Sequence, residues 1–100
     1  MEFHKRKLLT IITESIMEDA IEQELKLYKI SGYTILDARG SGQSGLRDAN
    51  HETDKNIRIE AICTEEIAKK LSLHLKQTYY ENYAMVLFLT DVEVLRPDKF

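Results

Sequence analysis

A glycine-rich segment contains the residues of this sequence best suited to bind a ligand. Positions 40–45 read Gly-Ser-Gly-Gln-Ser-Gly and hold three of the four glycines of the chain. Glycines let backbone N–H groups converge on an anion, and Arg39 and Arg47 add a positive charge on either side. The pattern matches the G-x-G-x-x-G dinucleotide fingerprint, but that fingerprint requires a helix at its last glycine, and residues 46–56 have no apolar repeat. A Walker loop is excluded because Leu46-Arg47 stands in place of Lys-Ser/Thr.

This segment opens a long polar loop that runs from Gly40 to about Lys55. Loops without secondary structure beyond ~12–15 residues are uncommon in compact domains, and most of them are functional or disordered. We expect the loop to be flexible when no ligand is bound. Two interpretations remain open from these residues alone: an anion-binding loop or a solvated hairpin loop.

No other group of side chains is arranged for catalysis, so we expect no catalytic residues, no metal site and no enzyme activity. The histidines His4, His51 and His74 are scattered, and none has a second ligand at metal spacing. The serines lack a His-Asp arrangement, and no carboxylate pair is marked for acid–base work. The single cysteine, Cys63, excludes a disulfide framework; we expect it to be buried and the protein to be cytoplasmic.

The composition of the chain further limits the kinds of protein that it can be. One hundred residues, 43% of them hydrophobic, suffice for one domain spanning residues 1–100. The net charge of −3 disfavours nucleic acid as a partner, because phosphate backbones require a basic face. No apolar run approaches the ~18 residues of a membrane span, so no membrane insertion is expected.

Apolar periodicity predicts strands and helices in alternation. Strands are expected at residues 8–13, 33–39, 57–63 and 84–89, with a last piece at 92–96 that extends the fourth strand or adds an edge strand. Ser15 and Glu18 form a capping box at the start of one helix, which Gly32 is expected to terminate. Thr64 caps a second helix. This order predicts an α+β, ferredoxin-like βαββαβ domain: an antiparallel sheet, two helices on one face, and the long loop between strands two and three.

The second face of the predicted sheet is also apolar. The fourth strand is apolar at every position, and Ile35 and Ile62 are expected to add apolar groups to that face. Because no third helix is predicted, we infer that another copy of the chain covers it. Two other functions of the same fold are disfavoured. An acylphosphatase-type enzyme needs Gly and Arg where residues 13–15 have neither, and an RRM-type RNA binder needs aromatic residues in strand 57–63.

With this order and this loop, the sequence resembles the PII signalling superfamily, especially its PII-like branch of carboxysome-associated PII and SbtB-type proteins. The resemblance covers nearly the whole chain and is carried by Gly-Tyr-Thr at 32–34, Gly-Ser-Gly at 40–42, Gly-Leu-Arg at 45–47, Asn-Ile-Arg-Ile-Glu at 56–60, Tyr-Glu-Asn-Tyr-Ala at 80–84 and Val-Glu-Val-Leu-Arg at 92–96.

The resemblance implies a homotrimer that binds AMP, ADP or ATP in clefts between subunits. Its long loop, called the T-loop, would change shape with the ligand and dock on a target protein, such as a bicarbonate transporter or a carboxysome component. Bicarbonate is implied as a second ligand. By position, the phosphate contacts would be Arg39, Gly40, Gly42 and Arg47. The adenine and ribose side would be Ile35, Leu36, Tyr83, Ala84 and Met85. Further contacts would be Glu60, Ile62 and Arg96.

The sequence departs from the nitrogen-sensing PII proteins at three places. Residues 81–85 lack the Gly and Lys of their phosphate-binding turn, Ser44 replaces their loop Gln, and no Tyr lies between Tyr33 and Tyr79. Sensing of 2-oxoglutarate and uridylylation are therefore not expected. Two other functions remain as alternatives: an ACT-like domain that binds an amino acid at a subunit interface, and a weak nucleotide hydrolase.

Overall fold

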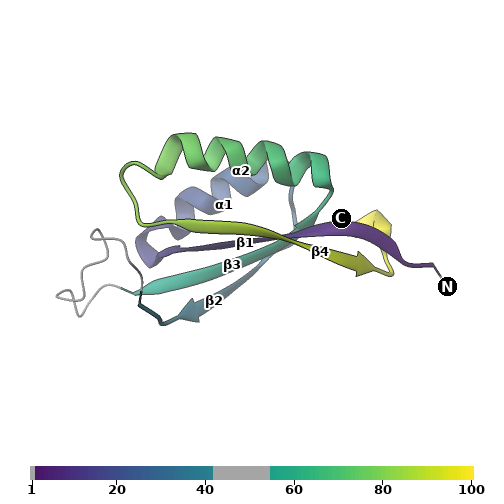
Figure 1. Ribbon diagram of the computed structural model, residues 1–100, viewed down its shortest axis with the longest axis horizontal. Helices are drawn as coiled ribbons and strands as arrows, with labels where there is room; N and C mark the ends of the chain where they lie inside the picture. The colour runs from purple at the N-terminus through teal and green to yellow at the C-terminus, as the bar shows by residue number, and fades with distance from the viewer. Residues whose placement is uncertain (1, 42–54) are drawn as a thin grey trace.

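A four-stranded antiparallel sheet with the order β2-β3-β1-β4 forms one layer, and two helices cover one of its faces (Figure 1). The computed structural model describes residues 2–41 and 55–100. Its elements are β1 (His4–Glu14), η1 (Ser15–Met17), α1 (Glu18–Leu27), β2 (Thr34–Ala38), β3 (Asn56–Cys63), α2 (Glu65–Tyr79), β4 (Val86–Val94) and η2 (Pro97–Lys99), where η marks a 3-10 helix. This is the predicted ferredoxin-like βαββαβ fold.

The central strands are longer than predicted. β1 begins at His4 instead of Leu8, because its polar first residues pair with the second half of β4, from His4 opposite Val94 onward. The segments predicted at 84–89 and 92–96 form one continuous strand for the same reason: Ile12 pairs with Val86, and the pairing runs without interruption.

The core lies between the sheet and the helices. Ile11 pairs with Ile59 on one side and with Leu87 on the other, so these three side chains share the face that the helices cover. α1 and α2 each contribute an apolar stripe to this face. The fully buried large apolar residues are Leu9, Ile11, Ile21, Leu25, Ile59, Leu71 and Leu75.

Of the two predicted helix starts, one is confirmed. The Thr64 hydroxyl caps α2 by accepting the backbone N–H of Ile67 at 3.3 Å. The Ser15–Glu18 capping box is wrong: residues 15–17 form the 3-10 turn η1, and α1 begins at Glu18 without a side-chain cap. The backbone N–H of Ser15 instead donates to the Lys55 carbonyl at 2.7 Å, which ties the end of β1 to the start of β3.

The end of α1 also differs from the prediction. Lys29, not Gly32, adopts the left-handed conformation that terminates the helix, with φ of 62°. The N–H of Ile30 donates to the Leu25 carbonyl at 2.9 Å, and that of Lys29 donates to the Lys26 carbonyl at 2.9 Å. These two bonds form a Schellman motif. The buried side chain of Ile30 anchors this helix end in the core, which explains why the stop falls before the glycine.

The second face of the sheet, called the open face here, carries no helix among the described residues. Its side chains alternate with the core-facing ones, so Thr10 lies there between Glu60 and Phe88. Leu36, Val86 and Phe88 are 47%, 46% and 42% exposed on it. Ile62 lies there as expected, opposite Leu8. Ile35 does not, because it pairs with Ile59 and packs against the core.

Candidate functional site

A cavity of about 330 Å³ lies at the base of the long loop, on the open face. Its walls come from every strand of the sheet and from the first residues after β2: Ile12, Ala38, Arg39, Gly40, Ser41, Asn56, Arg58 and Val86. The lining therefore combines two arginines, a glycine-containing backbone and apolar side chains. Such a combination suits a ligand with an anionic end and an apolar end.

Strand register brings these residues together. Ala38 pairs with Asn56, so β2 ends and β3 begins at the same place. Arg58 pairs with Ile12, and Ile12 pairs with Val86, which puts all three side chains in one row across the open face. Leu36 extends this row because it pairs with Arg58 on the other side. The cavity thus depends on contacts between residues that are far apart in the sequence.

The arginines of the cavity lining carry positive charge, and one of them, Arg58, is held in place by an ion pair. The Arg58 Nε donates to a Glu60 carboxylate oxygen at 2.9 Å, and both side chains are partly exposed. This contact holds the guanidinium group at the cavity wall. Arg39, the second arginine of the lining, forms no ion pair with another residue of 2–41 or 55–100.

Four of the residues predicted by position are gathered at or beside this cavity. Arg39 and Gly40 line it directly, and Glu60 contacts it through Arg58. Leu36 lies in the adjacent position of the same row and is exposed. Gly42 and Arg47 lie outside the described residues, as does most of the T-loop.

The other predicted residues of the described part, including Tyr83 in the turn after α2, do not line the cavity. Ile35 faces the core, and Ala84 and Met85 are buried. Ile62 pairs with Leu8, closer to the other end of the sheet. Arg96 follows β4 at that far end, and β4 itself spans about 26 Å from Val86 to Val94 at a rise of ~3.3 Å per residue.

Six cavity residues were not predicted as site residues: Ile12, Ala38, Ser41, Asn56, Arg58 and Val86. Arg58 belongs to the segment 56–60 that supports the resemblance, and its position two residues before Glu60 on a strand is a signal that it shares the face of that residue. Ile12 and Val86 carry no such local signal, because their place depends on the pairing of β1 with β4.

A hydrogen-bonded turn connects α2 to the cavity. The N–H of Tyr83 donates to the Tyr79 carbonyl at 3.0 Å, and the N–H of Met85 donates to the Tyr83 carbonyl at 2.9 Å. The N–H of Leu87 donates to the Tyr80 hydroxyl at 3.2 Å. The tyrosine rings at 79 and 83 meet edge to face, with centroids 6.2 Å apart. Residues 80–85, called the 80–85 turn below, thereby set where Val86 begins β4.

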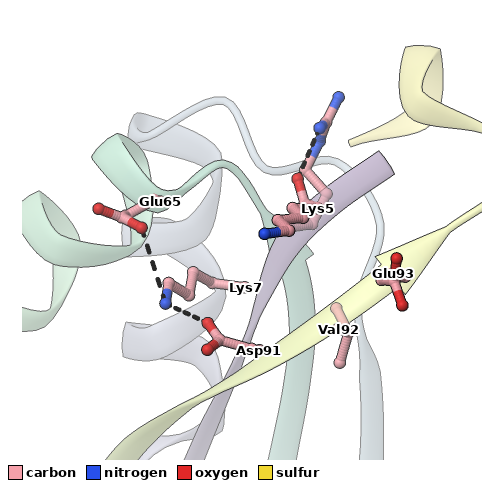
Figure 2. A pocket seen from close by; sticks show the side chains of 7 residues that line it. Lys5, Lys7, Glu65, Asp91, Val92 and Glu93 are labelled. Atoms are coloured by element: carbon pink, nitrogen blue, oxygen red, sulfur yellow. Dashed lines mark hydrogen bonds and ion pairs between the residues drawn. The ribbon is translucent and has the colours of Figure 1, made fainter. Parts of the chain in front are cut away.

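A second cavity, of about 550 Å³, lies where β1 and β4 extend beyond the start of α2 (Figure 2). Figure 2 shows Lys7 between Glu65 and Asp91; its amino group bonds to Asp91 and lies 3.7 Å from Glu65. These contacts raise the pKa of Lys7 and lower the pKa of Asp91. Lys5 pairs with Glu93 in the strand register, and Arg6 donates to the backbone carbonyls of Pro97 and Phe100, each at 3.1 Å. This cavity is larger, but its mixed charge gives an anionic ligand less attraction than the first cavity.

Other kinds of site find no support in the described part of the chain. It contains no group of three or more His, Cys, Asp or Glu side chains placed to hold a metal ion. No helix formed by these residues is long and apolar enough to cross a membrane. Cys63 is buried as predicted, and burial raises the pKa of its thiol, which disfavours a reactive thiolate.

Comparisons with known proteins agree with this geometry. The profile of the family described as "Nitrogen regulatory protein P-II" matches residues 6–99. Among solved structures, a PII-like signalling protein from Thermus thermophilus is 37% identical with a TM-score of 0.84, over 100% of this chain and 99% of that chain.

CPII from Thiomonas intermedia K12 is also similar. Its structure bound to ADP, AMP and acetate is 30% identical with a TM-score of 0.84, over 100% of this chain and 98% of that chain. Its structure bound to ADP and bicarbonate is 31% identical with a TM-score of 0.84, over 99% of this chain and 97% of that chain.

Proposed function

The chain belongs to the nitrogen regulatory protein P-II family, and on this premise we propose that it is a signalling protein that binds an adenine nucleotide at the base of its long loop. The observation that carries the proposal is the cavity in which Arg39 and Arg58 flank Gly40 beside the apolar side chains of Ile12 and Val86. The similar protein CPII has been crystallised with ADP and AMP, which supports this choice of ligand.

The charged and the apolar residues of the lining suit the two parts of a nucleotide. Arg39 and Arg58 would pair with phosphate oxygens, and the backbone N–H groups of Gly40 and Ser41 would donate to them. Glu60 would orient Arg58. The apolar side chains of Ile12 and Val86, which follow Arg58 in the same row, would contact the ribose and the base, as would Leu36 on the other side of Arg58. By position in the family, Gly42 and Arg47 add phosphate contacts from the loop.

We further propose that the nucleotide cleft is completed by a second subunit of a homotrimer. Exposed Leu36, Val86 and Phe88 on the open face favour burial against another copy of the chain. Arg96 lies at the far end of the sheet from the cavity of its own chain, so its contact with the nucleotide would be made across the subunit boundary. Tyr83 would contact the base from the 80–85 turn, and the buried side chains of Ala84 and Met85 would hold that turn in place.

Nucleotide binding would act as a switch of the T-loop. A phosphate held at the loop base would pair with Arg47 and favour one shape of residues 40–55, which a target protein reads. The CPII structure with bicarbonate supports a link to inorganic carbon, with a bicarbonate transporter or a carboxysome component as the target. The proposed location is the cytoplasm.

Calorimetric titration of the intact chain with AMP, ADP, ATP, cyclic AMP and glycine, with and without bicarbonate, tests this function. We expect binding of an adenine nucleotide and none of glycine. Binding of glycine alone would instead favour the ACT-like alternative. Release of phosphate from ATP during the titration would favour the weak hydrolase.

The switch itself is tested with Arg47→Ala. This change should weaken ADP more than adenosine, and it should leave the chain open to proteolysis after Lys55 even when nucleotide is bound. If nucleotide still protects the variant from proteolysis as it protects the wild type, Arg47 is not the residue that couples ligand to loop.

A further inference from the structure

Glu24 is the one charged side chain that is buried in the described part of the chain, at 8% exposure. It lies on α1 and faces α2, away from the nucleotide cavity. A buried carboxylate has a large desolvation penalty unless partners satisfy its oxygens. The partners of Glu24 therefore indicate what its burial achieves.

Both oxygens of Glu24 accept hydrogen bonds from α2. The Tyr79 hydroxyl donates to Oε2 of Glu24 at 2.6 Å, and the His74 Nε2 lies 2.9 Å from Oε1. Because an ionised carboxylate can only accept hydrogen bonds, His74 is the donor in the second contact. The His74 ring also packs against Tyr28 at a centroid distance of 5.8 Å. His74 thus lies within α2, whereas Tyr79 is the last residue of that helix.

Tyr79 connects the carboxylate to the 80–85 turn. Its carbonyl accepts the N–H of Tyr83 at 3.0 Å and that of Asn82 at 3.1 Å, and its ring meets the Tyr83 ring. The turn leads directly to Val86, which lines the cavity. A movement of Tyr79 would therefore displace the turn and the cavity wall together.

We infer that Glu24 is a positioning residue for the nucleotide cleft: its hydrogen bond to the Tyr79 hydroxyl orients the end of α2, the 80–85 turn and Val86. The inference rests on the proposed function of that cavity. An apolar side chain at position 24 would fill the same space without desolvating a charge, whereas only an acceptor can hold the hydroxyl in one direction.

Four variants separate positioning from packing. Tyr79→Phe removes only the hydroxyl. Glu24→Leu removes the hydrogen-bond acceptor but fills the same space with an apolar side chain. Glu24→Gln keeps an acceptor oxygen for Tyr79. His74→Phe is the matched control, because it removes the other hydrogen bond of the same carboxylate, the one that does not lead to the turn.

We expect Tyr79→Phe and Glu24→Leu to weaken ADP about tenfold, which corresponds to about 1.4 kcal/mol. Glu24→Gln and His74→Phe should stay within about twofold of the wild type, a change of less than about 0.5 kcal/mol. In the free protein, the methyl NMR resonance of Met85 should shift in Tyr79→Phe and Glu24→Leu and stay in place in His74→Phe.

The inference is overturned if Tyr79→Phe binds ADP as tightly as the wild type, or if His74→Phe weakens binding as much as Tyr79→Phe. Should Glu24→Leu fail to fold, the comparison of Tyr79→Phe with His74→Phe decides. If the wild type itself does not bind ADP, the proposed function fails, and the Met85 resonance of the free variants then tests the positioning of the turn by itself.

Discussion

Arg58 and Glu60 lie on the same face of β3, and the Arg58 Nε donates to the Glu60 carboxylate at 2.9 Å. The contact uses the nitrogen nearest the side-chain stem and leaves the terminal nitrogens outside the pair. The acidic residue that resemblance places at the nucleotide therefore acts on the cavity through the neighbouring arginine. This relationship makes Arg58 the residue whose removal is most informative.

Arg58→Ala should weaken ADP and ATP about ten- to hundredfold, since a hydrogen bond to a charged group contributes roughly 1.5–3 kcal/mol. Adenosine lacks the phosphates and should bind nearly as before. Calorimetry with the three ligands measures this difference. Lys69→Ala is the control, because Lys69 pairs with Glu65 on the exposed side of α2 and should leave all three affinities unchanged. An equal loss for adenosine would show that Arg58 supports the sheet and not the phosphates.

Phe88→Asp should prevent formation of the proposed homotrimer. Phe88 lies on the open face beside Thr10, where a second copy would bury it, and an unpaired carboxylate there would have to be desolvated. Light scattering coupled to size-exclusion chromatography measures the mass. Leu73→Asp is the control, because Leu73 is 60% exposed on α2, on the helix side of the sheet. A trimer that tolerates Phe88→Asp would exclude the open face as the subunit contact.

Lys29→Gly should raise the free energy of unfolding by about 1 kcal/mol, because a side chain in the left-handed region is strained by roughly that amount. Gly32→Ala should also stabilise, by about 0.4–1 kcal/mol, since Gly32 has no positive φ and its added Cβ would meet no atom within 4 Å. Chemical denaturation at fixed protein concentration measures both. Had Gly32 been the helix stop, Gly32→Ala would destabilise the protein.

The stability of the protein should fall between about pH 10 and pH 12 through Tyr79. Burial, and then the hydrogen bond to Glu24, raise the pKa of Tyr79 to about 12. The pKa of Tyr79 in the folded protein exceeds the unfolded value of ~10. Tyr79 therefore contributes its full stabilisation below about pH 10. This part of the free energy of unfolding is lost as the pH rises towards the folded pKa, by at most about 1.4 kcal/mol per pH unit. Tyr79→Phe should abolish this loss in denaturation curves measured across the window. The pKa values of Lys7 and Tyr33 are also raised, so the difference between wild type and variant is the quantity to compare.

Local patterns predicted the elements of the fold well. The cap at Thr64 is a property of neighbouring residues, and α2 begins directly after it as predicted. The predictions failed where a distant contact competes with a local one. The N–H of Ser15 is taken by the Lys55 carbonyl, and the burial of Ile30 ends α1 before Gly32.

The candidate site was predicted only in part, for the same reason. Arg39 and Gly40 could be found because they border the glycine-rich segment. Ile12 and Val86 could not, because their meeting depends on the register between the first and the last strand. Alternation along β2 separates Ile35 from Leu36, but both are apolar, so the strand alone does not reveal which of them faces the helices.

The pairing of β1 with β4 also has a consequence for how the chain folds while it is being synthesised. β1 leaves the ribosome first, and β4, its partner along nearly its whole length, leaves last. Loop-closure entropy makes such distant pairings slow to form, so β1 keeps one edge of unpaired N–H and C=O groups until β4 has been synthesised. A nascent chain truncated before Val86 would expose that edge to other chains, and aggregation would compete with folding at this stage.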